Sequence, residues 1–194
     1  MFRTIAKSSE GVYKEKGSKF YGYAIPVQSV QEVKEHLDYL RKENHGCVHV
    51  CFAYCLGSKK EEFRYSDDGE PSNSAGAPIY GQIKSFDLTN IVIAVVRYYG
   101  GTKLGVGGLI HAYRTVAKEA IENATIIEDE DRNLIEVTFT YEAMPFVMNV
   151  VKNSNCKIIE QDFQTSPRLK LSVPDSNNSL LDRLIKIKSV EIIK

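Results

Sequence analysis

The chain has 194 residues, of which 43% are hydrophobic and 26% charged, a composition typical of a globular protein with one large or two small domains. Its 25 basic and 25 acidic side chains give a formal net charge of zero, so the total charge favours neither DNA nor anionic lipid, although a local basic patch is compatible with it. No stretch reaches the roughly 18 apolar residues of a membrane span, and the segment MFRTIAKSSEG lacks the apolar core of a signal peptide. We therefore expect a cytoplasmic protein with no membrane partner and with its four cysteines reduced.

The first predicted elements are a hairpin and a helix. Lys14 to Ile25 has strand-like sequence on both sides of a turn at Gly17–Ser18. Ser29 is placed to cap the following helix, and Glu32 lies three residues later, as in a capping box. The helix itself is indicated by apolar residues at helical spacing, namely Val30, Val33, Leu37 and Leu40.

Two further strands and a short helix are predicted next. Val48 to Leu56 is strongly strand-like, and the polar segment Gly57 to Pro78 that follows is too long to be a simple connector. Ile79 to Phe86 predicts a short helix. Ile91 to Val96 is an unbroken apolar run, mostly β-branched, which is typical of a strand buried on both faces.

A glycine-rich stretch then leads into a helix. The glycines are Gly100, Gly101, Gly105, Gly107 and Gly108. The predicted helix, Leu109 to Asn123, has an apolar face made of Leu109, Ala112, Tyr113, Val116, Ala117, Ala120 and Ile121. A strand, a glycine turn and a helix start can hold an anion, because free N–H groups and the helix dipole converge there. The spacing fits neither G-x-x-x-x-G-K-[ST] nor G-x-G-x-x-G, so no nucleotide-binding fold is indicated by motif.

Two basic residues accompany the glycines. Arg97 precedes them and Lys103 lies among them, and either side chain could neutralise a phosphate or a carboxylate. The alternative is that the glycines allow tight packing against an acidic loop earlier in the chain, with Lys103 or Arg97 paired to one of its carboxylates. The sequence supports both interpretations equally.

That acidic loop, SDDGEPSNSAGAP, places Asp67, Asp68 and Glu70 within four positions. The carboxylates could bind a hard cation, and Asp68 or Glu70 could act as a general base. The simpler interpretation is turn chemistry, because Asp-Gly favours a tight turn. Ser72 and Ser74 belong to a bend suited to an anion or a backbone contact.

Cysteine and histidine alternate along the strand that begins near Val48. Cys47, His49, Cys51 and Cys55 are expected to share one face, which makes Cys47, His49 and Cys51 candidate zinc ligands. The spacing along a strand is poor for a complete ligand set, and buried cysteine commonly acts as a small hydrophobe. We therefore favour packing and expect neither a metal nor a cofactor.

The composition changes at Glu128 to Asn133, where we place a boundary between domains 1–130 and 131–194. The alternative is a surface loop within one domain. The remaining segment predicts the order βαββαβ of a ferredoxin-like domain. Its expected elements are Leu134 to Tyr141, Ala143 to Asn153, Cys156 to Phe163, Arg168 to Val173, Ser176 to Ile187 and Val190 to Ile193.

Four segments together resemble the IMPACT family, in particular its bacterial, two-domain YigZ branch. They are KFYGYAIPV, CVHVCFAY, DDGEPSNSAGAPI and VVRYYGGTKLGVGGLIHAY, in this order, and they cover about the first two-thirds of the chain. The chain departs from the family pattern at Asn73 and Ser74, where Gly-Thr is usual, at Tyr99 in place of Phe, and at His111 in place of Arg. The last change removes a fixed positive charge and weakens any phosphate role for that position.

The resemblance implies an α+β fold. Its N-terminal domain is expected to be like the second domain of the fifth small-subunit ribosomal protein, and its C-terminal domain like the last domain of elongation factor G. It also implies a link to translation, because eukaryotic relatives restrain the kinase that phosphorylates initiation factor two by competing for that kinase's activator protein. Bacteria lack this pathway, so that partner does not carry over.

Three functional hypotheses remain. The first is a binding protein that contacts the ribosome, RNA or a translation-associated protein through Arg97, Lys103, the loop Gly100 to Gly108 and the loop Asp67 to Ala77, with no specific DNA partner. The second is a hydrolase or phosphoryl-transfer enzyme that uses Asp68 or Glu70 with the glycine loop as an anion site. The third is that the two loops only hold the protein together. The sequence does not indicate an oligomeric state.

Overall fold

The structure, a computed structural model, describes residues 1–164 and 166–193. The chain divides into two compact units, Met1–Asp129 and Glu130–Lys194. The predicted division into domains 1–130 and 131–194 stays a prediction. No helix in the described ranges is long and apolar enough to cross a membrane.

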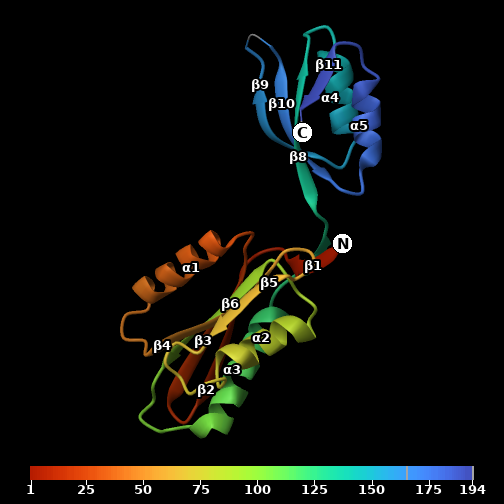
Figure 1. Cartoon of the computed structure of the whole chain (residues 1–194). Helices are drawn as coiled ribbons and strands as arrows, with labels where there is room; N and C mark the ends of the chain where they lie inside the picture. The colour runs from red at the N-terminus through yellow and green to blue at the C-terminus, as the bar shows by residue number, and fades with distance from the viewer. Residues whose placement is uncertain (165, 194) are drawn as a thin grey trace. The chain divides into compact units, whose positions relative to one another are not determined.

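The first unit is built on a five-stranded antiparallel sheet with the order β2-β3-β6-β4-β5 (Figure 1). A separate two-stranded antiparallel sheet joins β1 to β7. The elements are β1 Phe2–Ile5, β2 Ser9–Glu15, β3 Ser18–Pro26, α1 Val30–Glu43, β4 His49–Leu56, β5 Glu62–Ser66, α2 Gly76–Ser85, β6 Ile91–Tyr98, α3 Gly105–Glu122 and β7 Ile126–Asp129.

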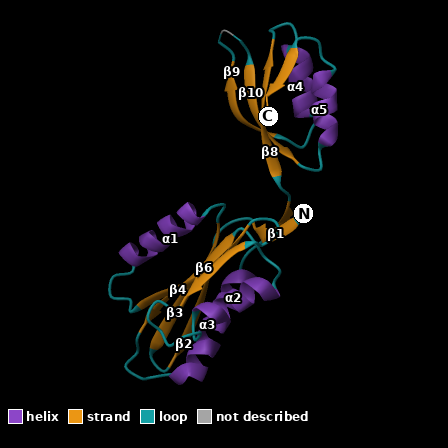
Figure 2. Ribbon diagram, in the orientation of Figure 1, coloured by secondary structure: helices purple, strands orange, loops and turns teal. Residues whose placement is uncertain are grey.

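Helices cover both faces of this sheet, with α1 on one face and α2 and α3 on the other (Figure 2). The central strand β6 therefore has no solvent face. Ile91, Ile93 and Val95 pack on the side of α2 and α3, and the alternate residues of β6 pack on the side of α1. Burial on both faces explains why Ile91 to Val96 is an unbroken apolar run, and it confirms the prediction of a strand buried on both faces.

Local signals in the first unit were reliable. The hairpin β2–β3 turns at Gly17, whose φ is +80°. Ser29 caps α1 by accepting the N–H of Glu32 at 3.2 Å, and the Glu32 carboxylate accepts the N–H of Gln28 at 3.0 Å. The seven residues predicted for the apolar face of α3 are all buried.

The glycine loop is shorter than predicted. Helix α3 begins at Gly105 rather than Leu109, so Gly105, Gly107 and Gly108 belong to its first turn. Gly100 packs against the β2–β3 turn and not against the acidic loop, because a Cβ at Gly100 would lie 1.9 Å from the carbonyl carbon of Gly17. The glycine at this position therefore serves a close backbone approach within the fold.

Strand β5 and the small β1–β7 sheet were not predicted. Strand β5 lies inside the polar segment Gly57 to Pro78, and α2 begins at Gly76, three residues earlier than expected. Four of the five residues of β5 are exposed. An edge strand of this kind lacks the alternation of apolar and polar residues from which strands are recognised.

The second unit has the predicted ferredoxin-like order βαββαβ. Its sheet is antiparallel with strand order β11-β8-β10-β9, and one apolar cluster joins the sheet to its two helices. The elements are β8 Arg132–Phe139, α4 Met144–Lys152, β9 Lys157–Asp162, β10 Arg168–Pro174, α5 Asn178–Ile185 and β11 Val190–Ile193. The predicted α+β class is confirmed in both units.

Candidate functional site

Asp67 organises the acidic loop by capping α2 from a distance in the sequence. Its carboxylate accepts the N–H groups of Asn73 at 2.8 Å, Ala75 at 3.0 Å and Gly76 at 2.8 Å. The helix has no acidic residue in its first turn, and its N-cap residue, Ala75, has no side chain that could accept a hydrogen bond. Asp67 therefore accepts the N–H groups of the N-cap residue and of the first residue of α2, and its charge complements the helix dipole.

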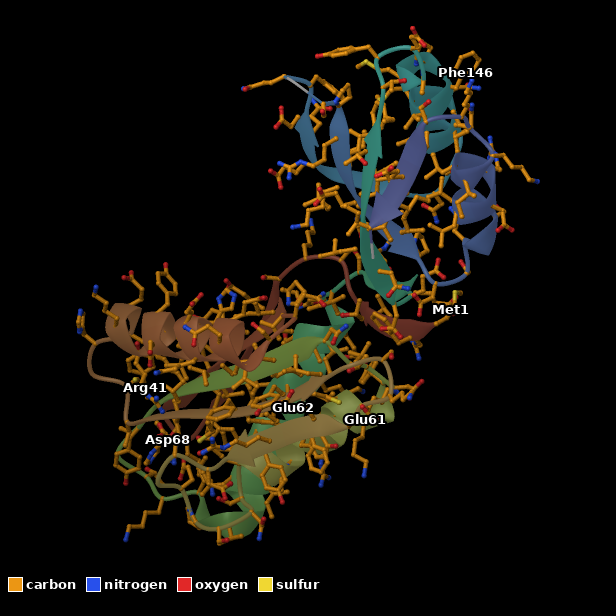
Figure 3. The ribbon with its side chains drawn as sticks, turned by 45° about the horizontal axis from the view of Figure 1, so that its top comes forward. Met1, Arg41, Glu61, Glu62, Asp68 and Phe146 are labelled. Carbon is orange, nitrogen blue, oxygen red and sulfur yellow. The ribbon has the colours of Figure 1, made fainter. Side chains whose placement is uncertain are left out.

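Asp68 fastens the same loop to α1 and β4. Its carboxylate accepts a hydrogen bond from Arg41 Nη2 at 2.9 Å and from the N–H of Val50 at 2.7 Å, and the Arg41 and Asp68 side chains are labelled in Figure 3. Its carbonyl oxygen lies 2.6 Å from Nδ1 of His49. Because a carbonyl oxygen only accepts, Nδ1 of His49 is the donor in this contact.

Glu70 forms a buried ion pair. Its Oε1 accepts hydrogen bonds from Arg97 Nη1 at 2.5 Å and from the Tyr113 hydroxyl at 2.8 Å. The side chains of Glu70 and Arg97 are 4% and 7% exposed, so solvent screens this attraction little. The alternative prediction, in which Arg97 pairs with a carboxylate of the acidic loop, is therefore correct, and the carboxylate is that of Glu70.

Two uncharged polar side chains, those of Tyr113 and Cys51, continue the hydrogen-bonded network from Glu70. The Cys51 sulfur lies 3.0 Å from the carbonyl oxygen of Asp67 and 3.3 Å from the Tyr113 hydroxyl, and its single S–H can donate to either oxygen. Burial raises the pKa of the Cys51 thiol, and it raises the pKa of Tyr113 too, with Cys51 and Glu70 adding to the effect. Cys51 therefore keeps its proton and donates, rather than acting as a thiolate ligand or nucleophile.

The start of α3 differs from the start of α2. Its N-cap residue, Leu104, cannot accept a hydrogen bond through its side chain, and its first turn holds no acidic residue. In the described ranges no side chain caps this end, and the exposed Lys103 next to it has no ion-pair partner. The positive end of the helix dipole is thus reinforced by a cation and balanced by no fixed anion.

The two loops meet at a pocket of about 520 Å³, which we call the loop pocket. The acidic loop contributes Glu70 and Pro71, and the end of β6 with the glycine loop contributes Arg97, Tyr99 and Lys103. The remaining lining comes from the start of β4 and the first residues of α3, namely Val48, His49, Leu104, Gly105, Val106 and Leu109. The predicted meeting of the two loops is therefore present.

The loop pocket contains only part of the predicted residue set. Glu70, Arg97, Lys103 and Gly105 line it. The others lie outside this lining, namely Asp67, Asp68, Ser72, Ser74, Gly100, Gly101, Gly107 and Gly108. Ser74 is buried, and its hydroxyl donates to the carbonyl oxygen of Pro71 at 2.6 Å. A role for any of these residues in partner binding stays a prediction.

Two valines of the loop pocket are not among the residues predicted from the sequence. Val48 and Val106 are 53% and 52% exposed, which is high for large apolar side chains. Val106 could have been found, because an apolar residue among glycines at a helix start does not belong to the buried face of that helix.

The prediction that the alternating cysteines share one face is wrong for Cys47. Strand β4 begins only at His49, and the chain turns before it, with the N–H of Cys47 donating to the carbonyl oxygen of Asn44 at 3.2 Å. Cys47 therefore packs with the cluster on the α1 side, whereas Cys51 and Cys55 belong to the cluster on the opposite side. Within the described ranges no group of three or more His, Cys, Asp or Glu side chains could hold a metal ion.

The enzyme hypothesis gains no support from the acidic loop. Asp68 and Glu70, its candidate bases, are both held by a basic side chain and a second hydrogen-bond donor. A general base needs access to a substrate proton, and these carboxylates are already occupied within the fold.

The model of the Impact N-terminal domain matches residues 16–121, which include both loops, β6 and most of α3. The chain belongs to the IMPACT family. YigZ of Escherichia coli is 29% identical over 161 residues, which cover 82% of this chain and 79% of YigZ. An IMPACT family member of Haemophilus influenzae is 29% identical over 182 residues, which cover 90% of this chain and 87% of that relative. A crystal structure described as that of a hypothetical protein has a TM-score of 0.75 and 25% identity, and it covers 99% of this chain and 96% of its own. The resemblance to the bacterial YigZ branch is confirmed.

Proposed function

We propose that this IMPACT-family protein is a cytoplasmic binding protein that regulates translation by contacting a component of the translation machinery, which is the ribosome, its RNA or a translation-associated protein. The link to translation rests on family membership and on what the resemblance implies for relatives. We expect no membrane partner and no sequence-specific DNA partner, because the formal net charge is zero.

The observation that carries the proposal is the loop pocket. It joins two of the segments by which the chain resembles the family, and it combines an uncapped helix start with an exposed cation and exposed apolar side chains. Exposed apolar side chains grouped around a charged centre are typical of a surface that binds another molecule.

The internal bonding of the acidic loop supports binding over catalysis. Asp67, Asp68 and Glu70 each accept hydrogen bonds that fix the shape of the loop. Their role in this proposal is to hold one wall of the pocket rigid, which lowers the entropy lost when a partner is ordered against it.

The test is co-sedimentation of the purified protein with ribosomes from the same organism at about 50 mM and about 300 mM KCl, since salt screens contacts between exposed charges. We expect association at low salt that weakens at high salt. Lys103→Ala should lower the bound fraction, because it removes the exposed cation of the pocket, whereas Lys34→Ala, on the exposed side of α1, should not. Absence of association at either salt, or equal binding of Lys103→Ala and wild type, would contradict the proposal.

A further inference from the structure

The guanidinium group of Arg97 is only partly used by the fold. Nη1 donates to Glu70, whereas Nε is buried and has no hydrogen-bond partner among the described residues. The rest of the group lies against aromatic rings, 5.4 Å from the centroid of Phe20 and 5.7 Å from that of Tyr99. A buried N–H without a partner is costly, so it calls for an acceptor that the chain itself does not supply.

The unpaired edge of the Arg97 guanidinium group can recognise a particular kind of acceptor. A guanidinium presents its donors as a planar fork, and two adjacent N–H groups on one edge match the two oxygens of a carboxylate. Glu70 occupies Nη1, and within the described ranges neither Nε nor Nη2 makes a hydrogen bond, so the edge that they form remains for a second acceptor. Arg97 lines the loop pocket, so an acceptor there would come from a ligand.

The start of α3 contributes donors to the same pocket. Gly105 and Val106 lie in the first turn and line the pocket, and no side chain in the described ranges caps this turn. Lys103 lies on the same lining. A helix start, a cation and a guanidinium group with an unpaired edge therefore belong to one pocket, and this combination favours an oxyanion.

The formal charge of the lining favours an oxyanion with a single negative charge. Arg97 and Lys103 are cations and Glu70 is an anion, so the lining carries one excess positive charge apart from His49. The helix dipole adds roughly half a charge. A phosphomonoester with about two negative charges would exceed this, whereas a carboxylate or a phosphodiester matches it.

The walls of the pocket favour a peptide over RNA. Val48, Leu104 and Val106 present aliphatic surface, and Val48 and Val106 are about half exposed. Surfaces for single-stranded RNA combine several cations along the backbone with free aromatic faces. Here Lys103 is the excess cation and the Tyr99 ring is already in contact with Arg97.

We propose that the loop pocket binds a carboxylate carried by an apolar peptide segment of a protein partner. The carboxylate would bind to the free edge of Arg97, the first turn of α3 and Lys103, and flanking apolar side chains would pack on Val48 and Val106. The proposal rests on the proposed function, because it names the chemistry of the partner in that contact.

The test is a titration of the ¹⁵N-labelled full chain, followed by NMR, with three synthetic peptides. The first peptide is Gly-Ser-Ala-Leu-Val-Leu with a free C-terminal carboxylate, and the second is the C-terminal amide of the same sequence. The third is the C-terminal amide of Gly-Ser-Ala-Leu-Asp-Val-Leu, whose carboxylate is the aspartate side chain. We expect the carboxylate peptides to shift the side-chain N–H signal of Arg97 Nε and the backbone signals of Gly105 and Val106. The neutral amide should bind at least about tenfold more weakly, because it lacks the charged acceptor. The stronger of the two carboxylate peptides identifies a chain end or an acidic side chain as the source.

A matched pair of variants tests the place of binding. Gly107→Asp adds a carboxylate in the first turn of α3, where a new Cβ meets no atom within 4 Å. It should preserve the fold, since acidic residues stabilise a helix start, and lower peptide affinity at least about tenfold by competing for the same donors. Gly81→Asp makes the same change of charge at an exposed position of α2 that is equally open, and should leave affinity within about twofold.

Three results would overturn the inference. The first is that the neutral amide binds as well as the carboxylate peptides, and the second is that Gly107→Asp binds like wild type. The third is that an octamer of uridylate shifts the Arg97 Nε signal while none of the peptides does, which would assign the pocket to RNA. If the peptides fail but Lys103-dependent co-sedimentation with ribosomes persists, only this inference fails. If both are lost, the proposed function fails with it.

Discussion

Helices α2 and α3 begin in similar ways but have different partners. Each starts at a glycine, Gly76 or Gly105, and follows an N-cap residue whose side chain cannot accept a hydrogen bond. Asp67 supplies the missing acceptor to α2, whereas no side chain in the described ranges supplies one to α3. One helix start is thus closed by the fold, and the other is open beside a pocket that contains Arg97 and Lys103.

This difference shows which charges near a pocket are available to a ligand. Three neighbouring carboxylates suggest catalysis or metal binding in the sequence, yet each of them is satisfied within the chain. In our proposal the groups that point to function are instead the unsatisfied ones, which are the Nε of Arg97 and the uncapped start of α3. Polar groups that a fold leaves unpaired call for an explanation, whereas satisfied ones are explained by the fold itself.

The largest expected effect follows from Glu70, which joins the closed loop to the open pocket. Glu70→Gln keeps an oxygen for the Tyr113 hydroxyl but leaves the buried Arg97 without its anion. We expect the free energy of unfolding to fall by about 3 kcal/mol, because one partner of a buried ion pair is lost. Urea unfolding followed by circular dichroism measures this.

The same variant should affect binding in the opposite direction. With Glu70 neutral, the excess positive charge of the loop pocket rises by one, so the carboxylate peptides should bind more tightly and with a steeper dependence on salt. Lower stability with tighter binding would separate the two roles of this residue. Unchanged stability would show that the Arg97–Glu70 pair contributes nothing to the fold.

Breaking the closed helix start should have the next largest effect. Asp67→Ala removes the acceptor of three backbone N–H groups and the negative charge at the start of α2. We expect a loss of about 2 kcal/mol, at the upper end of the range for helix caps, because several donors lose their partner together. Asp38→Ala, at an exposed position of α1, is the matched control and should change the stability by less than about 0.5 kcal/mol. Equal effects of the two variants would contradict the capping role of Asp67.

Much of the fold could be predicted because its signals are local. The turn at Gly17, the cap at Ser29 and the periodicity of α3 each depend on residues within a few positions of one another. The same holds for the ferredoxin-like order of the second unit. Strand β5 could not be predicted, because its place depends on pairing with β4 rather than on its own pattern. The early start of α3 was missed because glycine disfavours helix, and packing overrides that preference here.

The site was predicted less completely for a related reason. The sequence indicated that the two loops meet, and it offered Arg97 paired with Glu70 as one alternative. It did not indicate that Asp67 caps a helix that begins nine residues later, or that Arg41 holds Asp68 from another element. Such contacts depend on the folded path of the chain. The apolar wall at Val48 and Val106 was missed because sequence patterns associate apolar residues with the core.

The smallest effect tests the comparison of the two helix starts directly. An acidic residue added to the open start should stabilise the protein, whereas one added to the closed start should not, because Asp67 already occupies it. We expect Gly107→Asp to be about 0.5 kcal/mol more stable than Gly107→Asn, with both variants carrying the same loss of glycine.

At the closed start, Ala77→Asp should be no more stable than Ala77→Asn, because the added carboxylate meets the carboxylate of Asp67 instead of free N–H groups. Each difference between aspartate and asparagine isolates the charge, since the two side chains have nearly the same size, and thermal unfolding at low ionic strength resolves it. A gain of equal size at both helices would mean that Asp67 leaves the dipole of α2 unbalanced. No gain at α3 would mean that its N–H groups are not available, and the loop pocket would then lose the donors on which carboxylate binding depends.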